Sequence, residues 1–260
     1  MSHAETVYQF NIKKRLSSTN EPAEKLLVAD SWLVKDGCVR ALHLHRHRFF
    51  SSCIELAGTS PDILNEFWNA AIGKLPKTGL WFPRIELAGN LCCPVFQIRI
   101  RPAPAIHSTI RLIDYESRDF RKLPRHKGPD LANLISARKK IMGQGADDAI
   151  LSTSTGFLLE GLTTSIFWWE GSTLCTTSPS RRVLPGVTSQ LLRFIAEEEN
   201  IPFAHRFRKP DDLNGFEVWA VNALHGIRRV VVWEKSPFQT SSHIDIDFWR
   251  QKLDKFTKPV

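Results

Sequence analysis

Apolar residues recur along this chain with two periods, one typical of strands and one typical of helices. Residues 25–41 form two apolar runs separated by Asp36-Gly37, which predicts a β-hairpin. Helical spacing follows at residues 45–57 and at residues 60–71, where Ser60-Pro61-Asp62 marks the helix start. Three strand-like stretches come next, at residues 80–86, 94–100 and 109–113. These elements predict a first lobe of the α+β class.

A second group of elements begins after a stretch without periodicity. Residues 115–126 are polar and basic and contain a proline, so we expect a linker there. The pattern then predicts two long helices, at 129–142 and 186–198, and six short strands. We expect these strands at residues 149–151, 157–159, 164–169, 173–176, 217–221 and 229–233. The predicted domains are therefore a small α+β lobe at 1–114, a linker at 115–126 and a larger lobe at 127–260.

The composition is typical of a folded protein and gives expectations about its location and its cysteines. The chain has 260 residues, of which 42% are hydrophobic, and this is enough to build a substantial core. Residues 1–20 lack the apolar run of a cleavable signal, and no stretch is long enough to span a bilayer, so we expect a cytoplasmic protein. The five cysteines show no CxxC spacing and are expected to be reduced thiols. A net charge of +8 suits small anionic substrates and nucleic acid equally.

Short segments in a fixed order indicate the chemistry. Arg48 lies in HRHRFFSSC, and Lys127 lies directly before a predicted helix in HKGPDLANL. Glu160 ends a predicted strand within GADDAILSTSTGFLLEGLTTSIFWWEG, and the segment VLPGVTSQLL then opens a helix. Asn222-Ala223 follows an apolar strand. From about residue 30 to residue 232, this order resembles the class IV aminotransferases, also called fold-type IV pyridoxal phosphate (PLP) enzymes.

The resemblance implies a fold and a cofactor. The fold is two-lobed, with a small α/β sandwich lobe and a larger pseudo-barrel lobe, and the cofactor is pyridoxal 5'-phosphate. Lys127 is then the Schiff-base lysine and proton carrier, and its neighbours Arg125 and His126 favour the deprotonated amine that this role needs. Glu160 is expected to hydrogen-bond the pyridine nitrogen and to keep it protonated.

The same resemblance assigns the cofactor phosphate to other residues. Val187 and Thr188 are expected to bind it at a helix N-terminus, where backbone N–H groups and the helix dipole favour an anion. Arg48 is expected to reach the phosphate from the first lobe, and the turn at Asn222-Ala223 is expected to add further donors.

The substrate site is where this chain departs from the family. Residues 1–29 lack the Asn-Gly turn and the Gly-Asp-Gly motif with which family members usually begin, and that region helps to line the substrate pocket in relatives. An arginine binds a carboxylate through paired hydrogen bonds. Arginines in or beside predicted strands are therefore candidates, namely Arg84, Arg99, Arg101 and Arg228. From these arginines we assign Arg84 and Arg101 to the substrate site, and we add Ser31.

Two reactions fit these residues. The size, the basic balance and the segments HKGPDLANL and NALHGI favour a lyase resembling 4-amino-4-deoxychorismate lyase, which releases pyruvate and 4-aminobenzoate for folate synthesis. The alternatives are an aminotransferase of branched-chain or D-amino acids and a PLP-fold protein with reduced activity. Relatives are homodimers, so we expect a homodimer that binds a small anionic substrate with an amino group.

Metal and nucleic-acid functions have less support. His43, His45 and His47 alternate, which would align them on one face of a strand, but the resemblance puts at least the last two on a helix. Basic clusters accompany no nucleic-acid-binding signature, and no glycine-rich nucleotide loop occurs. We therefore expect no metal site, and neither nucleic acid nor a membrane as partner.

Overall fold

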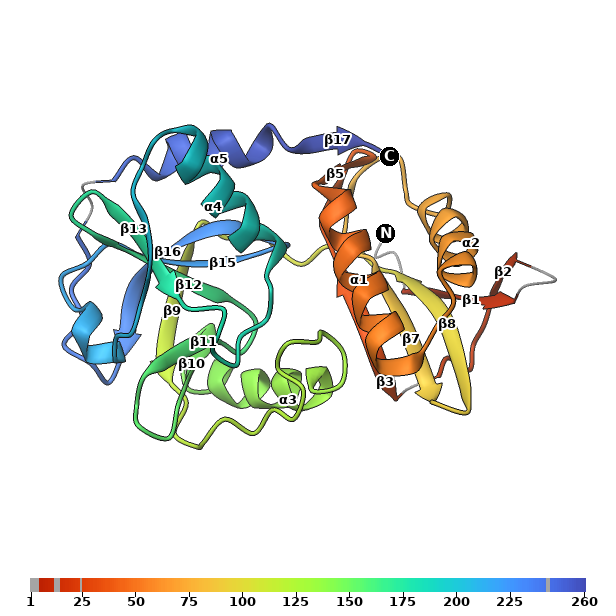
Figure 1. The fold of residues 1–260 in the computed structure, drawn as a ribbon, viewed down its shortest axis with the longest axis horizontal. Helices are drawn as coiled ribbons and strands as arrows, with labels where there is room; N and C mark the ends of the chain where they lie inside the picture. The colour runs from red at the N-terminus through yellow and green to blue at the C-terminus, as the bar shows by residue number, and fades with distance from the viewer. Residues whose placement is uncertain (1–4, 12–14, 24, 242–243) are drawn as a thin grey trace. The chain divides into compact units, whose positions relative to one another are not determined.

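The structure is a computed structural model that describes residues 5–11, 15–23, 25–241 and 244–260 of the chain. The chain divides into two compact units, whose elements are labelled in Figure 1. Unit 1 consists of Met1–Ile106, His126–Leu131 and Lys255–Val260, and unit 2 of His107–Arg125 and Ala132–Asp254. The predicted α+β architecture with two lobes is confirmed, whereas the boundaries of the lobes differ from those predicted.

The described residues of unit 1 form two antiparallel sheets and two helices. The larger sheet has the order β2-β1-β8-β7-β3 and the smaller one the order β17-β5-β4-β6. The strands are β1 (Thr6–Asn11), β2 (Arg15–Ser18), β3 (Leu26–Ser31), β4 (Val34–Lys35), β5 (Cys38–Arg40), β6 (Leu80–Trp81), β7 (Arg84–Asn90), β8 (Cys93–Ile100) and β17 (Thr257–Pro259). Helices α1 (Leu42–Ala57) and α2 (Pro61–Ile72) cover the larger sheet, and Phe49 and Phe67 pack against its Ile85 and Ile98.

Unit 2 is built around one curled sheet of eight strands, in the order β11-β10-β9-β16-β15-β12-β13-β14. Its strands are β9 (Thr109–Asp114), β10 (Asp148–Ser152), β11 (Leu158–Gly161), β12 (Ser165–Glu170), β13 (Thr173–Thr177), β14 (Phe203–Arg206), β15 (Val218–Asn222) and β16 (Gly226–Glu234). Its helices are α3 (Leu131–Met142), α4 (Val187–Glu198), the short 3-10 helix η1 (Pro210–Leu213) and α5 (Ile246–Asp254). The rings of Trp169, Trp219 and Trp249 pack edge to face and fix α5 against the sheet.

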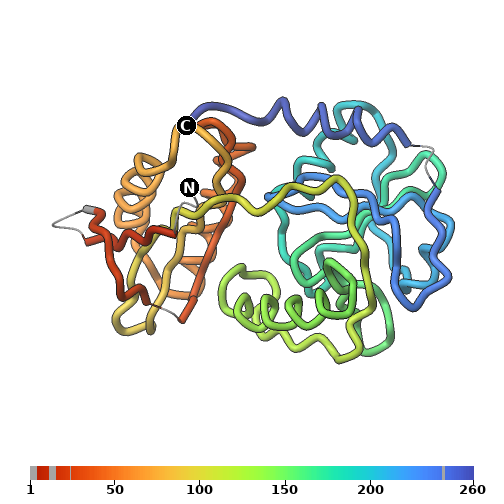
Figure 2. The backbone as a smooth tube through the Cα atoms, turned by 180° about the vertical axis from the view of Figure 1, so that it is seen from behind, coloured from red at the N-terminus to blue at the C-terminus, as the bar shows by residue number. Residues whose placement is uncertain are grey.

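Backbone pairing explains why the unit boundaries differ from the predicted lobes. The strand β9, predicted to belong to the first lobe, pairs in parallel with β10 and β16 of unit 2. The segment His126–Leu131, predicted to open the larger lobe, belongs to unit 1, because the Ala29 N–H donates to the Lys127 carbonyl over 2.7 Å. The strand β17 returns to β5 of unit 1, as the blue C-terminal segment in Figure 2 shows.

Several local predictions also need correction. One strand was expected at residues 80–86, but Pro83 lacks the N–H that would continue the ladder, and β6 and β7 join different sheets. The helix expected from residue 129 begins at Leu131. No element was expected before residue 25, at residues 203–206 or after residue 233, where the structure has β1, β2, β14, α5 and β17.

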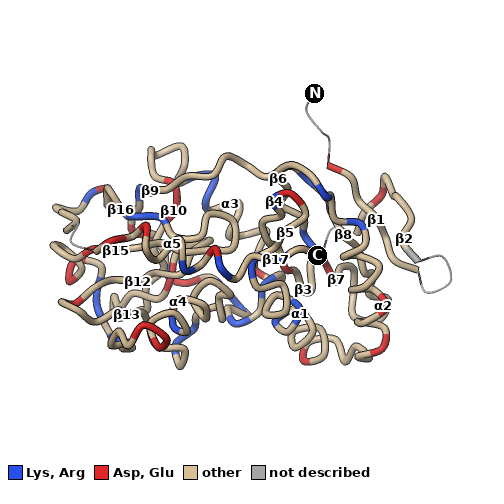
Figure 3. Tube along the Cα trace, turned by 90° about the horizontal axis from the view of Figure 1, so that it is seen from above, with Lys and Arg blue, Asp and Glu red and all other residues tan. Residues whose placement is uncertain are grey.

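Among the described residues, no helix has both the length and the apolar character to cross a membrane. The excess of basic residues is spread along both units, where blue and red positions are interspersed in Figure 3.

Candidate functional site

In unit 1, the backbone around Lys127 is tied to strand β3. The Lys127 carbonyl accepts the hydrogen bond from Ala29, and Gly128 follows with a φ of 138°. A Cβ atom added to Gly128 would lie 2.7 Å from Cα of Val28, so only glycine allows this approach. The segment thereby holds Lys127 beside the buried C-terminal part of β3.

The amine of Lys127 is desolvated and lies in a positive field. Burial and the charges of Arg48, Arg101 and Arg84 together lower the pKa of Lys127 to about 8, although the Asp30 carboxylate opposes the shift. A lysine with this pKa exists partly as the neutral amine near neutral pH, and this is the nucleophilic form. The sequence predicted Arg125 and His126 as the cause, but the structure gives the arginines of unit 1 that role.

A buried network surrounds Arg48. Asp30 is fully buried on β3 and accepts two hydrogen bonds from Arg48, at 2.8 Å to Oδ2 and 2.7 Å to Oδ1. Nδ1 of His45 lies 2.9 Å from Oδ1 of the same carboxylate. Because His45 and Arg48 are three residues apart on α1, they share one helix face toward β3. The Asp30 carboxylate therefore fixes the guanidinium of Arg48.

The predicted substrate arginines differ in how far their charges are compensated. Arg84 and Arg99 both donate to the fully buried carboxylate of Glu86. Arg101 donates to the Phe82 carbonyl over 2.9 Å and makes no ion pair among the described residues. Of these arginines, Arg101 is thus the one best able to bind an additional carboxylate.

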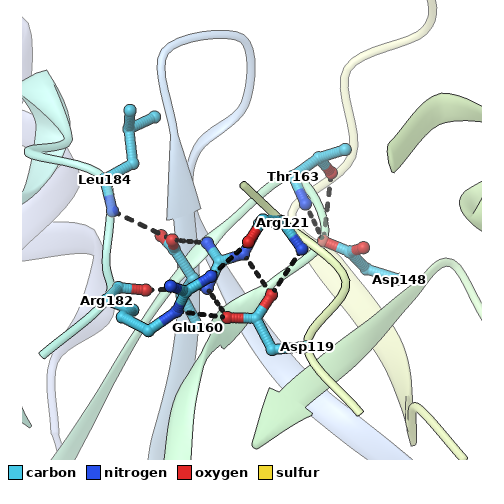
Figure 4. A network of polar contacts seen from close by, with 7 residues as sticks. All are labelled: Asp119, Arg121, Asp148, Glu160, Thr163, Arg182 and Leu184. Atoms are coloured by element: carbon cyan, nitrogen blue, oxygen red, sulfur yellow. Dashed lines mark hydrogen bonds and ion pairs between the residues drawn. The ribbon is translucent and has the colours of Figure 1, made fainter. Parts of the chain in front are cut away.

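In unit 2, the carboxylate of Glu160 is the centre of a polar network (Figure 4). Its Oε1 accepts from the guanidinium of Arg121 and from the Leu184 N–H, the latter over 2.9 Å. Its Oε2 makes no hydrogen bond within the described part of the chain. Burial raises the pKa of Glu160 to about 7, although Arg121 and the Leu184 N–H lower it. One oxygen is held in place and the other is open to a further donor.

The start of α4 has unused donors. The N-cap residue Gly186 has an extended conformation, and a Cβ there would lie 2.8 Å from Oγ of Ser189. The Ser189 hydroxyl is buried and has no hydrogen-bond partner among the described residues. Val187 and Thr188, the predicted phosphate-binding residues, are buried in the first helical turn. The N–H groups of a first helical turn have no intrahelical acceptor, so this end suits an anion.

The Asn222 side chain makes its hydrogen bonds within unit 2. Its Oδ1 accepts from the N–H groups of Leu224 and His225, over 3.1 and 2.9 Å, and its Nδ2 donates to the Thr163 carbonyl. The side chain therefore shapes the turn between β15 and β16.

Two further predicted residues, Ser31 and Arg228, are buried. Ser31 ends β3, is buried, and donates its N–H to Asp30. Arg228 is buried on β16, and its Nε has no hydrogen-bond partner within the described residues. Among those residues, no group of three His, Cys, Asp or Glu side chains is arranged to hold a metal ion.

Sequence reasoning missed the residues that orient the predicted ones. Asp30 had a signal, since an acidic residue interrupts the apolar run LLVADSW. His45 also had one, in its helical spacing from Arg48. Arg121 had none, because it lies in a basic stretch without periodicity, and Ser189 had only its place after Thr188.

Comparisons with known proteins relate this geometry to a family. The model of the family "Amino-transferase class IV" matches residues 27–233. A hypothetical aminotransferase from Mycobacterium tuberculosis, in a PLP-bound form, is 18% identical with a TM-score of 0.79, covering 97% of this chain and 98% of that chain. A branched-chain amino acid aminotransferase of T.th., complexed with N-(5'-phosphopyridoxyl)-L-glutamate, is 15% identical with a TM-score of 0.82, covering 98% of this chain and 95% of that chain.

A protein from Legionella pneumophila described as "Putative 4-amino-4-deoxychorismate lyase" is also similar. It is 20% identical with a TM-score of 0.74, covering 88% of this chain and 90% of that chain. No curated protein matches the chain significantly. The predicted fold type is confirmed by these similarities, and pyridoxal phosphate, the cofactor predicted, is the cofactor of the family. With more than half of its length matched, the chain belongs to the class IV aminotransferases, a family of PLP-dependent enzymes.

Proposed function

We propose that this protein is a PLP-dependent lyase that converts 4-amino-4-deoxychorismate to 4-aminobenzoate and pyruvate. The observation that carries the proposal is the desolvated amine of Lys127, which lies in the field of three arginines and can be neutral near pH 7. A substrate with two carboxylates, such as 4-amino-4-deoxychorismate, suits that positive field. The sequence similarity to the lyase, retained in HKGPDLANL and NALHGI, supports the same reaction.

The side chains fit the cofactor in charge and in donor type. Glu160 has an oxygen without a hydrogen bond, which suits a protonated pyridine nitrogen. The buried Ser189 hydroxyl without a partner and the first N–H groups of α4 suit a phosphate, with Thr188 beside them. Arg48 would add a charge-assisted bond to the phosphate. When bound, PLP withdraws electrons from the carbon that carries the substrate's amino group.

The remaining steps are proton transfers and binding by the protein. Lys127 would hold the cofactor covalently and, once displaced by substrate, would take the proton from the amine-bearing carbon. The C–O bond to the enolpyruvyl group then breaks, the ring becomes aromatic, and the released enolpyruvate takes up a proton to become pyruvate. Arg101 would bind a substrate carboxylate and so orient the ring, with Arg84 and Ser31 next to it.

The first experiment tests the cofactor and its attachment. The purified protein with PLP is reduced with borohydride, and its peptides are mapped. We expect the pyridoxyl group on Lys127 and no product from Lys127→Ala. A protein that stays colourless with PLP, or a label on another lysine, would contradict the assignment.

The second experiment separates the two reactions. Release of pyruvate and 4-aminobenzoate from 4-amino-4-deoxychorismate is the expected result. Amino transfer from branched-chain or D-amino acids to 2-oxoglutarate, without that release, would favour an aminotransferase instead. This alternative is kept because two of the similar structures are aminotransferases by name. We also propose a homodimer, which sedimentation of the holoprotein would test.

A further inference from the structure

Arg121 uses each of its nitrogens to join separate segments of unit 2. The residue is 5% exposed although it lies in the stretch predicted as a linker. Its Nε donates to Asp119 over 2.8 Å, its Nη1 donates to Glu160, and its Nη2 donates to the Arg182 carbonyl over 2.7 Å. Figure 4 shows the guanidinium between these groups. A planar fork with five N–H donors can satisfy three acceptors at once, which a lysine cannot do in the same plane.

The contact to Glu160 acts on the charge and the direction of that carboxylate. A carboxylate without a cationic partner in this buried position would hold its proton, because burial disfavours the charged form. Arg121 and the Leu184 N–H both bind Oε1, so rotation of the carboxylate is blocked and Oε2 keeps one direction.

The same contacts fix the chain before α4. Arg182 donates back to the Arg121 carbonyl, and its Nε lies 3.2 Å from Oδ2 of Asp119. Residues 119–121 and 182–184 are thus linked in both directions. Gly186, the N-cap of α4, follows two residues after this link.

We propose that Arg121 is a positioning residue that couples the two cofactor-binding elements of unit 2. It favours the ionised form of Glu160 against the effect of burial and leaves Oε2 open, and it anchors the segment that leads into the N-terminus of α4. The inference rests on the proposed function, since those two elements are the ones assigned to the cofactor's ring nitrogen and phosphate. Arg121 itself need not touch the cofactor.

The first test uses the cofactor-free protein, so that it does not depend on activity. With 13C-labelled glutamate, NMR gives the pKa of Glu160, identified by Glu160→Gln. We expect Arg121→Met to raise that pKa by about one unit or more, with Arg121→Lys in between. Arg193→Met, an exposed arginine on α4, is the matched control and should leave the pKa unchanged. An unchanged pKa in Arg121→Met would overturn the proposal.

The second test measures the dissociation constants of pyridoxal phosphate and of pyridoxal, which lacks the phosphate. Arg121→Met should weaken binding of pyridoxal phosphate by about tenfold or more, equivalent to about 1.4 kcal/mol. Its effect on pyridoxal should be smaller, because that ligand reports only the ring contact. If wild type and Arg121→Met bind PLP equally well, the proposed role of Arg121 is refuted, while the proposed function still stands. Failure of the wild-type protein to bind PLP would instead refute the proposed function.

If Arg121→Met fails to fold, Arg121→Lys replaces it in both tests, and a double-mutant cycle combines Arg121→Lys with Glu160→Gln. The loss of stability from Arg121→Lys should be smaller in the Glu160→Gln background, where the side chain carries no charge. Equal losses in both backgrounds would mean that Arg121 acts through Asp119 and the 182–184 segment without Glu160, and that half of the proposal would be withdrawn.

Discussion

Burial and neighbouring arginines act on Lys127 in the same direction. Both penalise the charged form of its amine, so its pKa falls to about 8 even though the Asp30 carboxylate opposes the shift. A lysine among solvated residues would be almost fully protonated at neutral pH. The lowered pKa of Lys127 thus comes from its surroundings, chiefly its desolvation and the charge of Arg48.

This pKa predicts the pH dependence of cofactor attachment. Only the neutral amine attacks a carbonyl, so the rate constant for attachment should rise about tenfold per pH unit below pH 8 and level off above it. Stopped-flow absorbance of the cofactor-free protein mixed with PLP measures this rate. Arg101→Leu removes a charge that lowers the pKa and should move the profile to higher pH. A flat profile between pH 6 and pH 9 would contradict the mechanism.

The pKa of Asp30 is lowered by its cationic neighbours, against the effect of burial. Burial alone would raise the pKa of Asp30, but Arg48 and His45 hold it far below the ordinary value of 3.8. The folded pKa is depressed, so this contribution to stability is fully present above pH 3.8 and declines as the pH falls toward the folded pKa.

Asp30→Asn should therefore destabilise the protein by about 3 kcal/mol at pH 7, because it leaves the Arg48 guanidinium buried without its counter-ion. Urea unfolding at pH 7 and at pH 3 measures the effect, and the difference from wild type should shrink at the lower pH. Glu66→Gln, an exposed acid on α2, serves as control and should change little at either pH. An equal loss at both pH values would show that the carboxylate charge is not what matters.

At the scale of elements, one glycine determines how the Lys127 segment meets β3. Gly128→Ala would place a Cβ 2.7 Å from Cα of Val28, at a φ of 138° that side chains rarely adopt. We expect a loss of about 1–3 kcal/mol in unfolding free energy, together with weaker PLP attachment. Gly171→Ala is the control, since Gly171 also has a positive φ but no atom within 4 Å of the added Cβ. If the two variants behave alike, the close approach to Val28 is not the cause.

The elements that could be predicted from the sequence are those with a local signal. Helix α2 begins at Ser60-Pro61, as predicted, because the Ser60 hydroxyl accepts the Asp62 N–H and proline suits the first turn. The strands β1 and β2 pair with each other, but they join the sheet only through β8, about 90 residues after β1, and no local pattern carries that pairing, so both strands were missed.

The candidate site follows the same division. Lys127, Glu160 and Thr188 could be proposed from the sequence because short motifs surround them, whereas Arg121 and Asp30 make their contacts between distant segments. The structure therefore adds the residues that set charge and direction, and it moves the source of the Lys127 pKa shift from its sequence neighbours to burial and to the charges of Arg48, Arg101 and Arg84.

At the scale of the whole molecule, the chain enters unit 1 three times. The last entry, Lys255–Val260, pairs β17 with β5, and the Ala41 N–H donates to the Phe256 carbonyl over 2.9 Å. Ala41 is the N-cap residue of α1, with a φ of 45°, so this contact holds the start of the helix that carries His45 and Arg48. The C-terminal strand thus supports the Lys127 site from the far end of the sequence.

Deletion of residues 255–260 should therefore loosen unit 1 before unit 2. Amide hydrogen exchange in residues 38–45 should become at least about tenfold faster, because β5 and the N-terminus of α1 lose their backbone partners. Exchange in β12 and β15, at the centre of the unit 2 sheet, should stay the same. Removal of Val260 alone keeps the pairing of β17 with β5 and is the matched control. Faster exchange throughout both units would instead mean that they unfold as one cooperative body.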